Sequence, residues 1–94
     1  MNFRILVENE RIKKIEKLLF DCKYTPENLE NKYKECKDAI VKAVTENVFM
    51  KRFQLTFDFS YLALYIYFRL KQDGFEKLEL NEGWSKIKLV INFE

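Results

Sequence analysis

The spacing of hydrophobic residues divides this chain into a mainly helical first half and a mainly extended second half. Phe3, Ile5 and Val7 occupy alternate positions, which predicts a short strand near the N-terminus. Asn9 is placed to cap the element that follows. That element is predicted to be a helix, because four hydrophobic residues recur at helical spacing on one face: Ile12, Ile15, Leu19 and Cys22.

A second helix has the clearest start signal in the chain. Thr25 can serve as its N-cap, and Pro26 suits the first helical position because the missing N–H has no partner there anyway. Tyr24 and Leu29 occupy the two positions of a hydrophobic staple. One apolar stripe then continues to about Val48 through Leu29, Tyr33, Cys36, Ile40 and Ala43 or Val44.

Charge placement supports this helix and suggests which side faces water. Glu30 with Lys34, and Asp38 with Lys42, form i,i+4 pairs of favourable order on the polar side. The two helices together predict a helical hairpin of unequal arms. The second arm, of about 23 residues and so about 34 Å, exceeds the ~27 Å of an eight-residue strand. One end should therefore project and offer a contact surface.

From Lys51 the hydrophobic period changes to two, which is typical of strands. Near Ser60 the phase slips by one residue, so a turn or a bulge is expected there. Two structures fit residues 60–71, and the sequence leaves both open. One is a strand with Leu62, Leu64, Ile66, Phe68 and Leu70 on one face, and the other is a buried helix.

Asp73 and Gly74 mark a hairpin turn if residues 60–71 are extended. A three-residue loop with Gly74 in the left-handed conformation keeps one apolar face, whereas a two-residue loop mixes the faces. The three-residue loop sets two leucines against core-facing residues of the preceding strand. The expected pairs are Leu78 with Phe68 and Leu80 with Ile66.

Glu82-Gly83 predicts the last turn, before a final strand that points Ile87, Leu89, Ile91 and Phe93 inward. The element order is then β-α-α-β-β-β(-β). We expect a single α+β domain over residues 1–94, with a helical hairpin packed on one face of an antiparallel sheet.

Composition removes several kinds of chemistry. Among 94 residues there is no histidine, which excludes Ser-His-Asp and Cys-His mechanisms and every His-ligated metal site. The formal net charge is only +2. Cys22 and Cys36 are expected to be reduced packing thiols, and two thiols without histidine do not make a zinc site. No catalytic residue, metal or cofactor is predicted.

Length and residue choice suggest a compartment and an origin. The longest apolar run, Tyr61 to Phe68, is far shorter than the about 20 residues of a membrane span, so a cytoplasmic protein without membrane contact is expected. Lys, Asn, Ile, Phe and Tyr have A/T-rich codons, and they dominate the chain. This bias is typical of a low-GC bacterium or a virus of one.

One set of residues stands out as a candidate binding site. If the helices cover the Leu/Ile/Phe face of the sheet, four aromatic residues and four cations fall on the other face. Tyr, Trp and Arg are enriched at protein-binding hot spots, and aromatic residues beside cations also suit single-stranded nucleic acid. The predicted partner-binding residues are Tyr61, Tyr65, Tyr67, Arg69, Lys77, Trp84, Lys86 and Lys88.

The predicted order of elements resembles that of the small mRNA-cleaving toxins of the RelE/ParE group. The resemblance covers topology alone, since the chain lacks their strand of alternating arginines followed by Gly-Asp-Tyr-Arg. It implies a ribonuclease toxin as one alternative function.

The small, compact, non-catalytic profile is similar to that of phage-encoded inhibitors of host defence, including anti-CRISPR proteins. We therefore expect a binding or inhibitor protein that docks a protein or nucleoprotein complex. An RNA- or single-stranded-DNA-binding module is the alternative. Pairing of free strand edges keeps a homodimer open.

Overall fold

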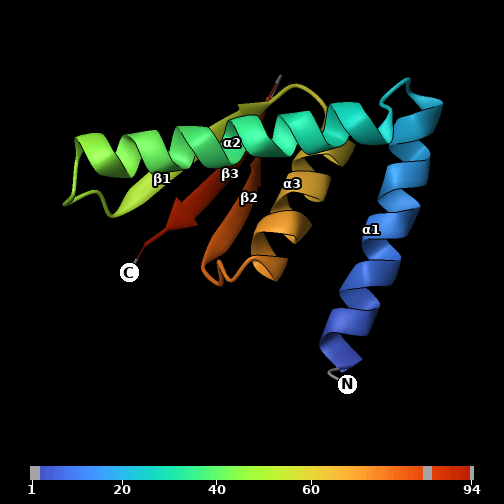
Figure 1. Ribbon diagram of the computed structural model, residues 1–94, viewed down its shortest axis with the longest axis horizontal. Helices are drawn as coiled ribbons and strands as arrows, with labels where there is room; N and C mark the ends of the chain where they lie inside the picture. The colour runs from blue at the N-terminus through green and yellow to red at the C-terminus, as the bar shows by residue number, and fades with distance from the viewer. Residues whose placement is uncertain (1–2, 84–85, 94) are drawn as a thin grey trace.

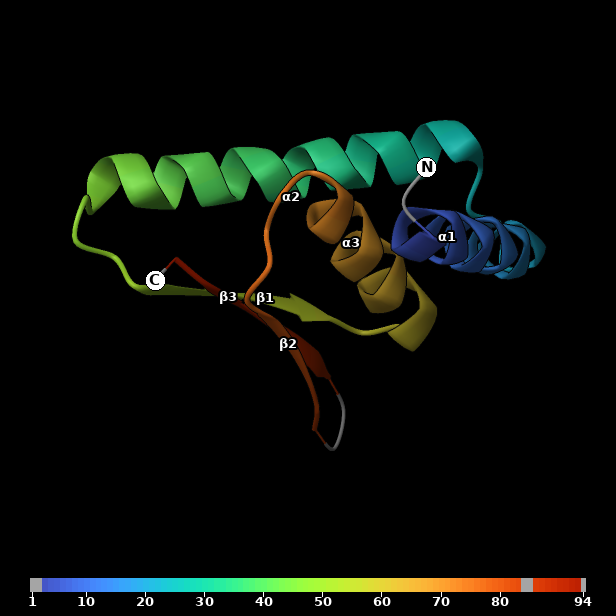
Figure 2. The ribbon, with the colours of Figure 1, turned by 90° about the horizontal axis from the view of Figure 1, so that it is seen from below.

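The computed structural model describes residues 3–83 and 86–93, and it places three helices on one face of a three-stranded antiparallel sheet (Figures 1 and 2). This confirms the predicted α+β class, although the order is α-α-β-α-β-β. The elements are α1 (Phe3–Asp21), α2 (Pro26–Glu46), β1 (Arg52–Phe57), α3 (Ser60–Gln72), β2 (Leu78–Glu82) and β3 (Ile87–Asn92).

The sheet has the strand order β1-β3-β2, so the last strand lies in the centre. Leu89 of β3 pairs with Leu55 on one side and with Leu80 on the other. Because strand side chains alternate, these three leucines share one face, which is the face that the helices cover (Figure 2). Leu89 and Ile91 are fully buried there, as predicted for the final strand.

The predicted start of α2 is confirmed. The Thr25 side chain accepts a hydrogen bond from the Asn28 backbone N–H at 3.2 Å, and the Asn28 side chain accepts from the Thr25 N–H at 3.3 Å. Pro26 is the first residue of the helix. The reciprocal pair satisfies donors that a helix leaves unpaired at its N-terminus.

The N-terminal strand prediction was wrong, because α1 begins at Phe3. Alternation over five residues is too short to exclude a helix. Asn9 consequently lies inside α1 rather than at its cap. Its side-chain oxygen accepts a hydrogen bond from Gln72 of α3.

Of the two alternatives for residues 60–71, the helix is correct. α3 lies between α1 and the sheet, with α2 also packed against it, so it is buried on several sides (Figure 2). Ala63, Ile66 and Leu70 are fully buried, and Leu62 and Phe68 are buried on other sides of the helix. A helix that is apolar all round has no amphipathic period, which explains why the sequence pattern did not distinguish it from a strand.

The loop after α3 combines a confirmed prediction with a wrong one. Gly74 has a φ of 107°, the positive value that was predicted, but it ends a helix instead of turning a hairpin. The Phe75 N–H donates to the Leu70 carbonyl at 3.1 Å, closing the last turn of α3. Leu78 therefore pairs with Ile91, and Leu80 with Leu89, rather than with Phe68 and Ile66.

The turn at Glu82-Gly83 is confirmed. Glu82 pairs with Ile87, and the Gly83 N–H donates to the Lys86 carbonyl at 2.9 Å, so β2 and β3 form a hairpin.

The first two helices are splayed apart rather than packed side by side. α1 packs on α3, while α2 runs across the width of the molecule (Figure 1). The predicted i,i+4 ion pairs of α2 are not found among the described residues: Glu30 reaches Arg69 instead of Lys34, and Asp38 and Lys42 are not within ion-pair distance.

The far end of α2 extends past the sheet. Its 21 residues span about 32 Å, whereas the six residues of β1 span about 20 Å. Leu29, Tyr33, Cys36 and Ile40 are buried as predicted. The continuation of this stripe to Val48 was wrong. Ala43 is half-buried, but Val44 and Val48 are exposed, because the short strands do not extend under the end of the helix.

Candidate functional site

The predicted aromatic and basic residues do not form one sheet face, because four of them belong to α3. Tyr65 is only 1% exposed and has no surface for a partner. Tyr67 is half-buried, with its ring 5.3 Å from that of Phe68 and the Lys71 ammonium 5.0 Å from its centre. Tyr61 is 38% exposed and makes an edge contact with Phe59 at 5.5 Å.

The predicted lysines lie elsewhere. Lys88 is on the uncovered face of the sheet, between Thr56 and Asn81 of the neighbouring strands. Lys77 precedes β2, and Lys86 lies in the turn before β3; both are exposed. Trp84 is outside the described residues. A binding role for the exposed members stays a prediction, but the single aromatic and basic face is not present among the described ones.

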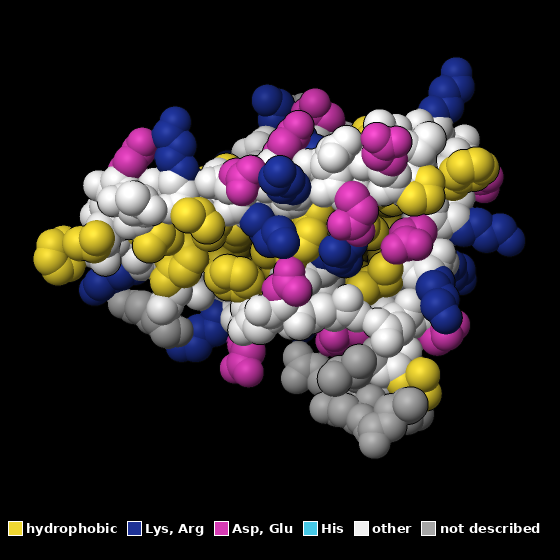
Figure 3. All heavy atoms as spheres, viewed as in Figure 1, with side chains coloured by type: hydrophobic (Ala, Val, Ile, Leu, Met, Phe, Trp, Pro, Cys, Tyr) yellow, Lys and Arg dark blue, Asp and Glu magenta, His cyan; other side chains and the backbone are white. Residues whose placement is uncertain are grey.

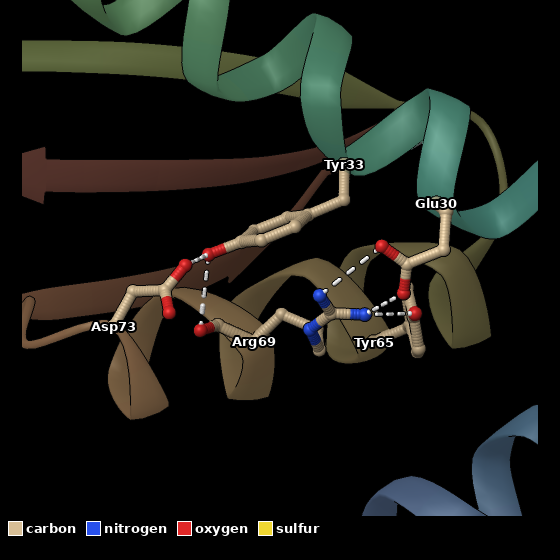
Figure 4. Close-up of polar contacts among 5 residues, drawn as sticks. All are labelled: Glu30, Tyr33, Tyr65, Arg69 and Asp73. Carbon is tan, nitrogen blue, oxygen red and sulfur yellow. Dashed lines mark hydrogen bonds and ion pairs between the residues drawn. The ribbon is translucent and has the colours of Figure 1, made fainter.

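Arg69 is the centre of a polar cluster that joins α2 to α3 (Figure 4). Its two terminal nitrogens donate to the two carboxylate oxygens of Glu30, and one of them also donates to the Tyr65 hydroxyl at 2.6 Å. The guanidinium carbon lies 4.5 Å from the ring centre of Tyr33 and 5.6 Å from that of Tyr65. Arg69 is therefore used inside the fold rather than offered to a partner.

Electrostatics within this cluster follow from the geometry. The hydrogen bond from Arg69 lowers the pKa of Glu30, and the same bond raises the pKa of Arg69, so both groups keep their charge near neutral pH. A bidentate charged pair of this kind is stronger and more directional than a single-point contact.

Tyr33 extends the cluster toward the end of α3. Its hydroxyl donates to the Asp73 carboxylate and lies 3.1 Å from the Arg69 carbonyl oxygen (Figure 4). Burial is the main cause that raises the pKa of Tyr33, and the hydrogen bond to Asp73 adds to it. Burial also raises the pKa of Tyr65. Both phenols are protonated near neutral pH, so neither provides a phenolate for proton abstraction.

A groove of about 590 Å³ opens beside this cluster, between α1 and α3. Several of its polar groups are already paired: Arg69 with Glu30, Gln72 with Asn9, and Lys13 with Glu10 at 3.4 Å. Within the described part of the chain, no group of His, Cys, Asp and Glu could hold a metal ion. The groove thus contains the connections between helices rather than a recognisable set of reacting groups.

The uncovered face of the sheet is polar. A hollow of about 510 Å³ on it is lined by Arg52, Gln54, Asn81, Lys88 and Val90, together with Phe53. Arg52 also reaches Glu79 on the far strand at 4.0 Å. Apart from Phe53, which belongs to the helix-covered face by its alternation, none of the described residues that line this hollow has an aromatic side chain on which a nucleic-acid base could stack.

The most unusual surface is apolar and lies at the far end of α2. Val48 is 74% exposed and Phe49 is 87% exposed. Val41 and Val44 are exposed on the same side of the helix, three residues apart. Figure 3 shows hydrophobic side chains gathered at this end of the molecule. We call Val41, Val44, Val48 and Phe49 the α2-end patch.

Sequence reasoning found only part of this patch. The excess length of the second helix predicted that one end would project, and α2 does extend beyond the sheet. Val44, as an alternative to Ala43, and Val48 were however assigned to the apolar stripe of the second helix, and Val41 and Phe49 were not placed. The angular signal separates Val41 alone. At 100° per residue Val41 lies about 90° around the helix from the stripe of Tyr33 and Ile40, whereas Val44 lies about 30° away and Val48 follows the end of α2.

The remaining chemistry is limited. Cys36 is buried, which raises its pKa, and Cys22 is exposed; neither forms a disulfide. None of the described helices combines the length and the apolar character that crossing a membrane requires. Comparison with protein-family models, curated proteins and solved structures finds no match for this chain.

Proposed function

We propose that this chain is a non-catalytic binding protein that docks a protein partner through the α2-end patch. The exposure of Val48 and Phe49 is the observation that supports the proposal. Contiguous apolar surface on a small protein is typical of an interaction site, whereas single exposed apolar residues are ordinary. Leu6 and Phe20 are such single residues on α1.

The energetics favour a patch that becomes buried on binding. A fully buried Val or Phe side chain contributes about 1.5–3 kcal/mol relative to an exposed one. Two such anchors at the centre of an interface are enough for a hot spot. The fold gains little from them, because both side chains lie mainly in water.

A protein partner suits this chemistry better than a nucleic acid. The patch holds one aromatic residue, Phe49, and three valines, so it offers no series of rings for stacking. The narrower expectation of an inhibitor of host defence belongs to the same proposal, since a protein without catalytic groups inhibits by covering a partner's surface.

The test is capture of the tagged protein's partners from a low-GC bacterial lysate, with and without nuclease, followed by affinity measurement with the purified partner. We expect Val48→Ser with Phe49→Ser to weaken binding at least ~30-fold, which corresponds to about 2 kcal/mol. Phe20→Ser is the matched control, because it removes the same kind of side chain as Phe49→Ser from an isolated position on α1 where it is 62% exposed. This control should change the affinity less than about twofold.

Two results would contradict the proposal. One is a partner bound equally well by the wild type and by the double variant. The other is a retained set that disappears with nuclease and leaves co-purified RNA or DNA, which would favour nucleic-acid binding.

A further inference from the structure

We infer that two copies of this chain pair antiparallel through the outer edges of their β1 strands, which joins two three-stranded sheets into one. The inference goes beyond the proposed function, because this edge consists of other residues than the α2-end patch. β1 is an edge strand, since the order in the sheet is β1-β3-β2 (Figure 1). The unpaired peptide groups of an edge strand are a template on which a further strand can pair.

The hydrogen-bond ladder shows which peptide groups of β1 are free. The Phe93 N–H donates to the Lys51 carbonyl at 2.9 Å, so these two residues form a hydrogen-bonded pair at the start of the ladder. Because such pairs alternate in antiparallel strands, every second residue after Lys51 turns its peptide groups to β3, and the residues between them turn theirs outward. No described residue forms a hydrogen bond with these outward groups. The residues that carry them are Arg52, Gln54 and Thr56.

One register makes the apolar side of this edge complementary to itself. Leu55 then lies opposite Leu55 of the second copy, and Phe53 lies opposite Phe57, all on the helix-covered face. Phe53 and Leu55 are only half-buried within one chain, so a neighbouring strand would remove more of their surface from water. A two-fold axis at Leu55 gives both copies the same contacts and closes the assembly at two chains.

The same register gives complementary contacts on the open face. Gln54 lies opposite Thr56, and Arg52 lies opposite Asp58, which directly follows the strand. Asp58 is exposed and forms no ion pair with a described residue. Arg52 has a 4.0 Å contact with Glu79, but both of these side chains are mostly in water. The dimer therefore gains an opposite-charge pair at each end of the new seam.

The other free edge of the sheet is less suited to a second copy. β2 contains Glu79 and Glu82 and no cation, so pairing through it would bring the carboxylates of both chains to one seam. β1 has no charged residue from Phe53 to Phe57, and its one-to-one register with β3 contains no bulge. Over these five residues β1 lacks the charges, prolines and bulges that protect edge strands from pairing.

The test begins with the mass of the purified protein in solution. Sedimentation equilibrium of the wild type between about 1 µM and about 1 mM should show a mass that rises toward twice that of one chain. Gln54→Pro removes an N–H that points outward, so it blocks the new seam and leaves the ladder between β1 and β3 intact. This variant should dimerise at least tenfold more weakly.

Charge complementation tests the register and does not depend on a proline. Arg52→Asp places two carboxylates opposite each other at both ends of the seam, and Asp58→Arg places two guanidinium groups there. Each variant alone should dimerise at least tenfold more weakly, whereas a mixture of the two should form heterodimers within about threefold of the wild-type affinity. Asp21→Arg, the same substitution at the exposed end of α1, should change dimerisation less than about twofold.

The outcomes separate this inference from the proposed function. A wild type that stays monomeric to about 1 mM would overturn the dimer and leave the proposal for the α2-end patch unchanged. A mass that rises beyond two chains would indicate pairing of β1 with β2 in an open series, and it would also overturn the closed dimer.

A dimer that persists in all the β1 variants would overturn pairing through β1. If that dimer is lost in Val48→Ser with Phe49→Ser, the second copy docks on the α2-end patch, which supports the proposed function alone. Thermal unfolding identifies the variants that keep the fold, and the charge complementation decides the question if Gln54→Pro does not.

Discussion

Arg69 shows how one residue can be recognised as unusual from the sequence while its structural contacts are missed. It is the only charged residue between Tyr61 and Leu70, and a charge within an apolar segment needs a partner. The sequence shows its position in that segment. Its partner could not be predicted from the sequence, because Glu30 is 39 positions earlier and contacts Arg69 only after α2 and α3 pack. Long-range pairing of this kind has no signature in periodicity.

Removing the Arg69 side chain is expected to destabilise the fold. Arg69→Ala should lower the free energy of unfolding by about 1–2 kcal/mol. It removes the paired hydrogen bonds to Glu30 and the contacts of the guanidinium with the rings of Tyr33 and Tyr65. Glu30→Gln should cost less, about 0.5–1 kcal/mol, because Glu30 is mostly exposed. Urea unfolding measures both free energies. As a control, Lys88→Ala should change the midpoint little, because Lys88 is exposed and forms no ion pair with any described residue.

The pH dependence gives a second measurement on the same pair. Because Arg69 lowers the pKa of Glu30 in the folded state, its stabilisation is complete above the unfolded carboxyl pKa of about 4.3 and is lost as pH falls through the folded value. The stability difference between wild type and Glu30→Gln should therefore be present at about pH 7 and shrink by about pH 3. An equal difference at both pH values would show that the carboxylate charge contributes nothing.

Elements with local signals were predicted well, and elements defined by their neighbours were not. The start of α2 is determined by Thr25, Pro26 and Asn28, all within four positions, so its cap could be read from the sequence. The strand β1 kept a period of two because one of its faces is open, whereas in β3 Val90 is buried along with Leu89 and Ile91. α3 has no such period, since α1, α2 and the sheet together surround it.

The residues that follow α1 and α3 have positive φ values, which predicts how substitutions there change stability. Lys23, just after α1, has a φ of 73°, a left-handed value that costs a side-chain-bearing residue about 1 kcal/mol or more. Lys23→Gly should therefore raise the free energy of unfolding by about 0.5–1 kcal/mol. Gly74→Ala should lower it by about 1 kcal/mol through the backbone alone, because a Cβ there would touch nothing within 4 Å.

A matched control uses the same substitution inside the helix. Lys17→Gly, on the exposed side of α1, should cost about 1 kcal/mol because glycine is unfavourable in a helix interior. Chemical denaturation of the three variants would therefore give one gain and two losses. A loss for Lys23→Gly as large as that for Lys17→Gly would mean that the positive φ is not kept in solution.

At the scale of the whole molecule, a long helix covers a small sheet. Strands of five and six residues cannot cover a helix of 21 residues, so the apolar surface of α2 divides into a part that builds the core and a part that does not. The sequence allowed the excess length to be predicted. The point that separates the two parts lies after Ile40, the last buried residue of α2. This point could not be predicted, because it depends on where the strands lie under the helix.

This division predicts that the α2-end patch can be removed without loss of the fold. Val48→Ser with Phe49→Ser should change the free energy of unfolding by less than about 0.5 kcal/mol, because both side chains already lie mostly in water. Leu89→Ala, in the centre of the sheet and fully buried, should cost about 2–5 kcal/mol. Equilibrium unfolding in urea distinguishes the two cases. A loss of about 2 kcal/mol or more in the serine variant would place Val48 and Phe49 in the core in solution, and the surface proposed to bind a partner would then not be free to do so.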